Sequence, residues 1–306
     1  MNEKTIAAIA LSNRDYPSLA AKLDEAVKWV EIAAVQGADL AVLPEDLNIY
    51  RGDGGDVSLP DMALDNWQRD TARLLETAVR CRIAVTVPVL VREQGRMANR
   101  FYLVSKEGAI LGHYQKRNVT PGERAAGVEP GHTAPIRWDG LSVGGAICFD
   151  TFYQNVFAQQ AGAGVDLFLV PSLTPAGQVL DYYALVYGKP IVLAYPAWSR
   201  VIDRDGQELA HGGQRWETLR YGFGSPVVIA AVNFDAVTLF ADFNQQRMVD
   251  VQRRYGRRVR IRFDQPNCLF YLESRCAELT VDEVMCEFGL ISRQQYFARY
   301  TRQAEK

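Results

Sequence analysis

The chain has 306 residues, of which 48% are hydrophobic and 23% are charged, and its formal net charge at pH 7 is −2. This composition is typical of a soluble globular protein, and the small charge argues against a general affinity for nucleic acid or anionic membranes. Five cysteines without a CxxC pair predict neither a disulfide framework nor a zinc site, and they fit a reducing compartment. No signal-peptide pattern and no apolar run of about 18 residues is present. We therefore expect a cytoplasmic protein that does not enter membranes.

Strands and helices alternate through the first half of the chain. Apolar runs bounded by turn residues predict strands and runs with helical spacing predict helices; in chain order these are the strand 6–11, a helix opening at Pro17, the strand 39–46, the helix 67–80, and the strands 83–91, 100–104 and 110–115. Lys106-Glu107-Gly108 predicts the turn of a hairpin. Two loops interrupt this pattern, a Gly- and Asp-rich one at 52–56 and a Pro- and Gly-rich one at 117–131.

The same alternation continues up to about residue 241. The predicted elements are the strand 143–147, a helix from about Phe152, the strand 165–170, a helix at 182–187, the strand 191–195, a hairpin at 201–209 with an Asp-Gly turn, and the strand 227–232. Alternating strands, helices and hairpins predict an α/β protein whose layers are built on mixed sheets.

Composition changes after residue 241, where six arginines lie between 253 and 262. Alternation of arginine with apolar residues over 258–263 predicts a strand with one basic face, which is solvated, faces another subunit or binds phosphate. Thr280 to Glu283 forms a capping box that opens a helix, Gly289 can end it, and Ser292 can cap another. This pair of helices is interpreted as a tail that packs on the body or on a partner subunit, with a DNA-binding helix-turn-helix as the alternative.

Three chemically active residues stand at the ends of predicted strands, namely Glu45, Lys116 and Cys148. Strand ends are where ligands and catalytic groups gather in α/β sheets, so the three side chains can share one pocket. Cys148 precedes a predicted helix, whose free N–H groups and dipole are expected to lower the thiol pKa. Each residue also has an ordinary interpretation: a polar turn for Glu45, a solvated pair for Lys116 and Arg117, and a small buried hydrophobe for Cys148.

These motifs resemble those of the nitrilase superfamily of carbon–nitrogen hydrolases. Leu43-Pro44-Glu45 is similar to the family's strand-end glutamate, 114–117 to its lysine motif and 145–150 to its nucleophile motif, in the family's order. Glu123 is similar to the family's further glutamate. The resemblance covers about residues 6–235 and implies a four-layer αββα sandwich that forms homodimers or larger homo-oligomers. We therefore expect a hydrolase domain at 1–241 and a C-terminal extension at 242–306.

The resemblance also implies a mechanism that explains the residue types. Cys148 would attack an amide, N-carbamoyl or nitrile carbon and form a thioester, because so poor an electrophile needs a thiolate. Glu45 would act as general base, and Lys116 with the backbone N–H of Phe149 would stabilise the charge that develops on the substrate. Glu123 would orient the substrate or hold Lys116. This chemistry requires a small-molecule substrate and no metal or organic cofactor.

Residues that bind the substrate are predicted near the strand ends. They are Tyr50, Phe149, Tyr153, Ser172 and Trp198, although aromatic residues in such positions are as typical of a core. The pair Phe149-Asp150 resembles the amidase-like branches, where nitrilases proper usually have Trp-Glu, whereas the loop around Glu123 resembles that of nitrilases.

Two other functions are compatible with the sequence. Gly140-Leu141-Ser142-Val143-Gly144 matches the G-x-S-x-G pattern of a serine esterase, but the strand follows Ser142 whereas an elbow needs it before. A catalytically silent family member whose basic extension binds a partner or nucleic acid is the other alternative, against which the intact Glu45, Lys116 and Cys148 count. For the extension itself we do not expect nucleic acid as the main partner.

Overall fold

The computed structural model describes residues 2–11, 16–50, 58–213 and 225–304, with side chains up to residue 300. The chain forms two compact units, Thr5–Ala230 and a smaller unit that combines Met1–Lys4 with Ala231–Lys306. A division of roles between segments 1–241 and 242–306 stays a prediction. The predicted Gly- and Asp-rich loop at 52–56 lies outside the described residues.

Two six-stranded sheets form the centre of the larger unit. The first has the order β12 (Val227–Asn233), β1 (Glu3–Ile9), β2 (Leu40–Val42), β3 (Ala84–Glu93), β4 (Arg96–Val104) and β5 (Ile110–Gln115). The second has the order β11 (Glu208–Gly212), β10 (Ser199–Ile202), β9 (Ile191–Ala194), β8 (Leu167–Pro171), β7 (Leu141–Gly145) and β6 (Ile136–Trp138). Strands β1, β2 and β3 are parallel, as are β7, β8 and β9, and the hairpin strands at the edges are antiparallel.

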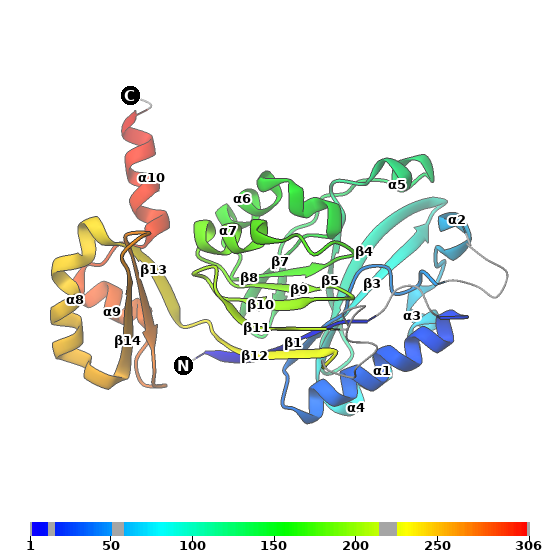
Figure 1. The fold of residues 1–306 in the computed structure, drawn as a ribbon, viewed down its shortest axis with the longest axis horizontal. Helices are drawn as coiled ribbons and strands as arrows, with labels where there is room; N and C mark the ends of the chain where they lie inside the picture. Colours follow the sequence, from blue (N-terminus) through cyan, green and yellow to red (C-terminus); the bar gives the residue numbers. More distant parts are fainter. Residues whose placement is uncertain (1, 12–15, 51–57, 214–224, 305–306) are drawn as a thin grey trace. The chain divides into compact units, whose positions relative to one another are not determined.

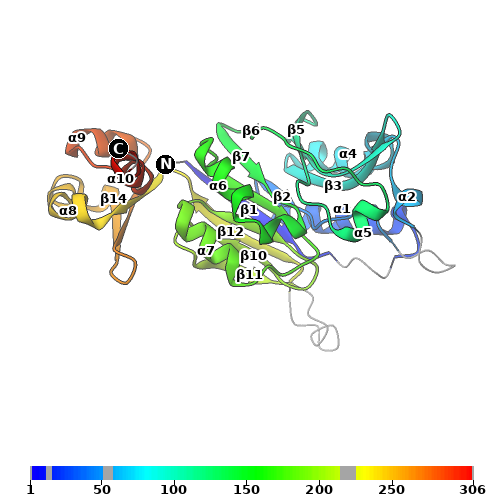
Figure 2. The same ribbon diagram turned by 90° about the horizontal axis from the view of Figure 1, so that it is seen from above.

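Helices cover the outer faces of the two sheets (Figure 1). On the first sheet lie α1 (Leu19–Val35) and α4 (Ala72–Cys81), whose apolar faces share one buried core with β3. On the second lie α6 (Gln154–Gly162) and α7 (Gln178–Tyr187), which share another buried core with β8 and β9. The inner faces meet where β2 packs against β9 and β5 against β6, and Figure 2 shows the same layers from above. The predicted four-layer αββα sandwich is therefore confirmed.

Local hydrogen bonds explain where several elements differ from the predicted bounds. The strand predicted at 39–46 ends early, because the N–H of Leu43 donates to the side chain of Thr86 (2.9 Å) and not to a strand backbone. The helix predicted at 67–80 is split into α3 (Trp67–Asp70) and α4 at Thr71, whose hydroxyl donates to the Trp67 carbonyl (2.8 Å). Such back-bonding by threonine competes with helical hydrogen bonding.

One short helix lies inside the loop predicted at 117–131. The helix α5 (Pro121–Ala125) begins with a capping box, in which Thr120 and Glu123 each satisfy the other's backbone N–H. A second short helix, α2 (Leu59–Met62), follows the undescribed residues 51–57. Of the two, α5 carries a residue of the candidate site, Glu123.

A three-stranded antiparallel sheet and three helices make up the smaller unit. Its strands are β13 (Ala236–Phe240), β15 (Leu269–Ser274) and β14 (Val259–Asp264), in this order, and its helices are α8 (Ala241–Tyr255), α9 (Val281–Phe288) and α10 (Arg293–Ala304). As predicted, Thr280 caps α9 in a capping box, Gly289 ends it with a φ of 57°, and the hydroxyl of Ser292 accepts from Gln295 at the start of α10.

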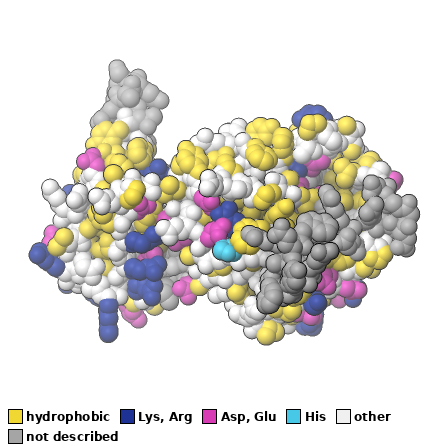
Figure 3. Space-filling view, in the orientation of Figure 1, with side chains coloured by type: hydrophobic (Ala, Val, Ile, Leu, Met, Phe, Trp, Pro, Cys, Tyr) yellow, Lys and Arg dark blue, Asp and Glu magenta, His cyan; other side chains and the backbone are white. Residues whose placement is uncertain are grey.

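The basic stretch is divided between a helix and a strand. Arg253 and Arg254 belong to α8, Arg257 and Arg258 to the short 3₁₀ helix η2 (Gly256–Arg258), and the basic strand predicted at 258–263 is β14, which begins at Val259. Lysine and arginine side chains gather on the visible face of this unit (Figure 3). Arg260 on β14 forms an ion pair with Glu273 on β15 (2.7 Å). Of the helices in the described residues, none has both the length and the apolar character that crossing a membrane requires.

Candidate active site

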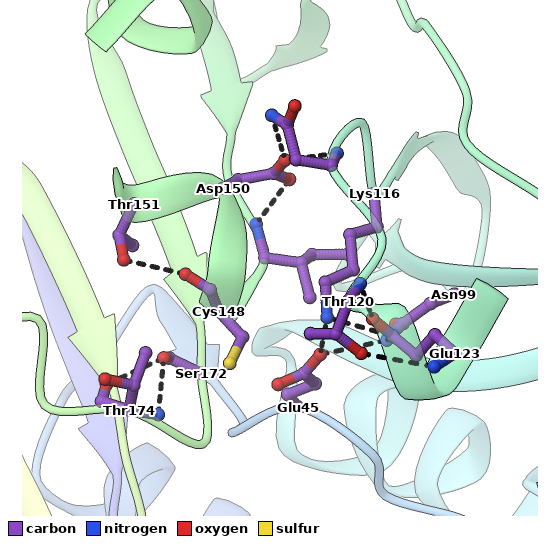
Figure 4. Close-up of polar contacts among 12 residues, drawn as sticks. Glu45, Asn99, Lys116, Thr120, Glu123, Cys148, Asp150, Thr151, Ser172 and Thr174 are labelled. Atoms are coloured by element: carbon purple, nitrogen blue, oxygen red, sulfur yellow. Dashed lines mark hydrogen bonds and ion pairs between the residues drawn. The ribbon is translucent and has the colours of Figure 1, made fainter. Parts of the chain in front are cut away.

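The predicted strand-end residues meet in the larger unit (Figure 4). Lys116 Nζ lies 2.8 Å from Glu45 Oε1 and 2.9 Å from Glu123 Oε1. Glu45 follows β2 and Lys116 follows β5 in the first sheet, Glu123 lies on α5, and Cys148 follows β7 in the second sheet. The cluster therefore draws residues from both sheets, and the structure brings all four predicted catalytic residues together.

The segment that carries Glu45 is fixed by a buried lysine from α1. Lys22 donates to the backbone carbonyls of Asp46 (2.8 Å) and Ile49 (2.7 Å), and Asp46 has the left-handed φ of 62°. Burial lowers the pKa of Lys22, and burial together with the neighbouring Glu45 carboxylate raises the pKa of Asp46. Glu45 itself is 2% exposed. This turn thus sets the direction in which Glu45 projects.

Lys116 is held as a cation by the two carboxylates. Burial alone would lower the pKa of its ammonium group, but Glu45 and Glu123 outweigh that effect and raise it. The same partnership acts on Glu123. Burial would raise the pKa of this carboxyl, whereas Lys116, the backbone of Thr120 and the Asn99 amide lower it below its usual range. A charged triad of one cation and two anions is the result.

Asn99 belongs to this cluster, although no sequence pattern singled it out. Its Nδ2 donates to Oε1 of Glu45 and to Oε1 of Glu123, both at 2.9 Å. Asn99 lies on β4, and its carbonyl accepts from the backbone N–H of Lys116 (2.9 Å), so the two residues are cross-strand neighbours. A polar residue directly before the apolar run predicted at 100–104 was the signal that could have revealed it.

Cys148 begins the five-residue 3₁₀ helix η1 (Cys148–Phe152), and its φ is 46°. The expectation of a lowered thiol pKa is wrong. Burial raises the pKa of Cys148 to about 12, the Glu45 carboxylate adds to the effect, and Lys116 and the backbone N–H of Leu173 only partly oppose it. The short helix supplies too little field to offset burial next to an anion. The resting sulfur is therefore a thiol with a carboxylate beside it.

Asp150 joins the nucleophile turn to the lysine loop. Its carboxylate accepts from the backbone N–H groups of Ile147 (3.1 Å), Arg117 (3.3 Å) and Asn118 (2.7 Å), and from the hydroxyl of Tyr114 (3.0 Å). Burial raises the pKa of this carboxyl while these donors oppose the effect. Because its donors come from both sheets, Asp150 fixes the strand end of Lys116 relative to the turn of Cys148.

The residues predicted to bind substrate are less uniform in their placement. Phe149 and Tyr153 pack edge to face (5.4 Å between ring centroids) beside Cys148, and Tyr153 is 38% exposed. Ser172 is fully buried, and its hydroxyl donates to the carbonyl of Thr174 (2.7 Å), which shapes the turn next to Cys148. Trp198, in the connection from β9 to β10, stacks on His211 of β11 with 4.4 Å between the ring centroids. Tyr50 is half-buried, five residues after Glu45.

The rival serine motif lies in a different environment. Ser142 is a buried residue inside β7, and the turn formed by Asp139 and Gly140, with φ values of 47° and 83°, comes before it. A nucleophile elbow needs the strand before the serine and a helix after it, so this geometry does not match. In the described residues, no group of three His, Cys, Asp or Glu side chains is arranged to hold a metal ion.

Comparison with known proteins identifies the family. The sequence model of the carbon-nitrogen hydrolases matches residues 5–241, and the chain therefore belongs to the carbon-nitrogen hydrolase family. An (R)-stereoselective amidase from a Pseudomonas species is 31% identical over 144 residues, which are 46% of this chain and 51% of the relative. The match thus spans about half the length of that curated relative.

Solved structures with this fold include other family members. An amidase from Nesterenkonia sp. AN1, a double mutant in complex with acrylamide, has a TM-score of 0.65 at 20% identity and covers 83% of this chain and 97% of that one. A carbon-nitrogen hydrolase from Helicobacter pylori G27 has a TM-score of 0.63 at 14% identity, with coverage of 83% and 93%. At these identities the likeness shows the fold.

Proposed function

We propose that this chain is a cysteine-dependent hydrolase that cleaves a carbon–nitrogen bond of a small molecule, with an amide as the favoured substrate, through a thioester. The observation that carries the proposal is the Lys116 ammonium between the Glu45 and Glu123 carboxylates, next to the Cys148 thiol. The names of the similar proteins favour an amide over a nitrile or an N-carbamoyl compound. In a mutant of the Nesterenkonia amidase, the active-site cysteine carries the product of Michael addition of acrylamide and, in another structure, the acetamide moiety of fluoroacetamide.

The first half-reaction forms the thioester. Cys148 Sγ attacks the carbonyl carbon while its proton passes to the Glu45 carboxylate, because a thiol with so high a pKa needs a base in contact with it. The carbonyl oxygen becomes an oxyanion, which Lys116 and the backbone N–H of Phe149 stabilise. The carbon–nitrogen bond then breaks, and the departing amine or ammonia takes the proton from Glu45.

The second half-reaction restores the enzyme. Glu45 removes a proton from water, the resulting hydroxide attacks the thioester carbon, and the same donors stabilise the second oxyanion. The carbon–sulfur bond breaks, the carboxylic acid leaves, and the proton returns from Glu45 to the sulfur. Glu123 contributes by holding Lys116 in place, since its carboxylate oxygen lies 2.9 Å from the ammonium.

Ammonia release from a panel of primary amides, nitriles and N-carbamoyl compounds tests this proposal. We expect turnover of one class by the wild-type protein and a loss of at least about 10³-fold in Cys148→Ala, because the nucleophile forms the intermediate. Cys81→Ala is the matched control, since Cys81 is also a half-buried free cysteine, and it should keep full activity. Equal turnover by Cys148→Ala and wild type would contradict the proposal.

A further inference from the structure

Two donors bridge the same two carboxylate oxygens in the candidate site. Lys116 Nζ and Asn99 Nδ2 each reach Oε1 of Glu45 and Oε1 of Glu123, and the four distances lie between 2.8 and 2.9 Å. The lysine supplies the charge that two buried glutamates need. An amide adds no charge, so Asn99 contributes only direction to this arrangement.

The orientation of the Asn99 amide is set by its surroundings and has a cost. Reversing the amide would place its oxygen against two carboxylates, so Nδ2 must face Glu45 and Glu123. Oδ1 then points elsewhere and has no hydrogen-bond partner among the described residues, although Asn99 is only 2% exposed. A buried unpaired oxygen is destabilising, and such groups are retained where they serve a function.

The consequence for Glu45 concerns its two carboxylate oxygens. Oε1 receives one hydrogen bond from Lys116 and one from Asn99, so both of its lone-pair directions face donors. Figure 4 shows the other oxygen of Glu45 on the side of the Cys148 sulfur. Because Oε1 already accepts two hydrogen bonds, Oε2 is the oxygen of Glu45 that is open to the proton of the Cys148 thiol.

We propose that Asn99 is a positioning residue that, together with Lys116, occupies Oε1 of Glu45 and thereby reserves Oε2 as the acceptor of the Cys148 proton. In this step the S–H bond breaks and an Oε2–H bond forms, and the proton later passes to the leaving amine. The direction of this transfer rests on the proposed function. The occupation of Oε1 rests on the contacts alone.

A double-mutant cycle on the alkylation of Cys148 tests this role. Wild type, Asn99→Leu, Glu45→Gln and the double variant are treated with iodoacetamide at neutral pH, and peptide mass spectrometry gives the rate at Cys148. We expect Asn99→Leu to slow alkylation about tenfold, equivalent to about 1.4 kcal/mol, as the loss of one hydrogen bond to a charged group implies. In the Glu45→Gln background the same change should alter the rate less than about twofold.

The cycle separates positioning from general structural damage. A residue that acts through Glu45 loses its effect when Glu45 is replaced, whereas a merely structural residue slows both backgrounds alike. Equal slowing in both backgrounds, or none in the wild-type background, would overturn the proposal. Asn244→Leu is the matched control: Asn244 is a fully buried amide whose Nδ2 also donates twice, to Phe240 and Ile291, in the smaller unit. It should leave the alkylation of Cys148 unchanged.

Hydrolysis and unfolding provide two further readouts. With an active substrate, the acidic limb of the Asn99→Leu rate profile should move up by about half to one pH unit, because its carboxylates lose a donor. Its unfolding midpoint should stay near that of wild type, since leucine also removes the unpaired oxygen. Alkylation needs no substrate, so absent hydrolysis in all proteins contradicts the proposed function while the cycle still decides the role of Asn99.

Discussion

Two buried groups of charged side chains lie in the larger unit, and they differ in how completely their polar atoms are paired. In the arginine cluster, Arg200 on β10 is 6% exposed and its guanidinium binds the carboxylates of Asp181 and Glu208 and the carbonyl of Gly177. Each nitrogen of the guanidinium has an acceptor there. This cluster joins α7 to the β10–β11 hairpin and fits a purely structural role.

The active-site cluster of Glu45, Asn99, Lys116, Glu123 and Cys148 breaks several rules that the arginine cluster obeys. A carboxylate lies beside a thiol whose pKa it raises, the nucleophile has a φ of 46°, and the Asn99 amide oxygen has no hydrogen-bond partner in the part of the chain that the structure describes. Such conflicts lower stability, and proteins keep them where chemistry requires them. A shifted pKa alone does not separate the two clusters, because burial also raises the pKa of a carboxyl in the arginine cluster.

Glu45→Gln should produce the largest difference between the clusters. Hydrolysis should fall about 10³- to 10⁴-fold, because the general base is lost, as measured by ammonia release on any active substrate. Alkylation of Cys148 by iodoacetamide at neutral pH should fall far less, by about tenfold, because this reaction loses only the acceptor of the thiol proton, and removal of the negative charge that helps to raise the thiol pKa partly offsets that loss. Glu208→Gln, in the arginine cluster, should change neither rate. A parallel fall of both rates in Glu45→Gln would show that this change damages the fold.

Arg200→Met should lower the stability of the fold and leave the reactivity of Cys148 unchanged, whereas Glu45→Gln mainly affects the chemistry. The variant leaves the partly exposed carboxylates of Asp181 and Glu208 without their buried cation, so the free energy of unfolding in urea should fall by about 2 kcal/mol. Alkylation of Cys148 in the folded protein should stay within about twofold of wild type, because Arg200 donates to Gly177, Asp181 and Glu208, none of which belongs to the active-site cluster. If alkylation changed tenfold while stability did not, the assignment of a structural role to the arginine cluster would be wrong.

The alternation of strands and helices and the three strand-end residues were predictable because each depends on local signals. Apolar runs that end in Glu45, Lys116 and Cys148 are visible in one sequence, whereas the four-layer sandwich, which brings the two sheets together, and the role of Glu123 were implied by the resemblance to the nitrilase superfamily. The caps at Thr280 and Gly289 were equally readable, since capping depends on residues only three or four positions apart.

Properties that depend on contacts across the fold were not predictable in this way. The place of Asn99 follows from the register of β4 against β5, which sets it beside Lys116. The rise in the Cys148 pKa follows from burial and from Glu45, which lies more than 100 residues away in the chain. The helix α5 does not depend on such distant contacts, because its capping box of Thr120 and Glu123 can be read from the sequence of the loop predicted at 117–131.

Glu123→Gln should lower the free energy of unfolding by a smaller amount, and this loss should depend on pH. Burial would raise the pKa of Glu123, but Lys116, Thr120 and Asn99 lower it, so the folded protein binds this proton less tightly than the unfolded chain. The resulting stabilisation exists above the unfolded value of about 4.3 and disappears as the pH falls through the folded one. Wild type should therefore exceed the variant by about 2 kcal/mol near neutral pH, and the gap should close below about pH 4.

Asp181→Asn is the matched variant in the arginine cluster. Its stability relative to wild type should change with pH in the opposite direction. Burial raises the pKa of Asp181 more than Arg200 lowers it, so the folded protein binds this proton more tightly than the unfolded chain. Acidification therefore favours wild type over Asp181→Asn, while it removes the advantage of wild type over Glu123→Gln. Urea unfolding of all three proteins between about pH 3 and pH 8 measures both slopes. Slopes of the same sign would show that the two clusters do not differ in how their carboxylates are charged.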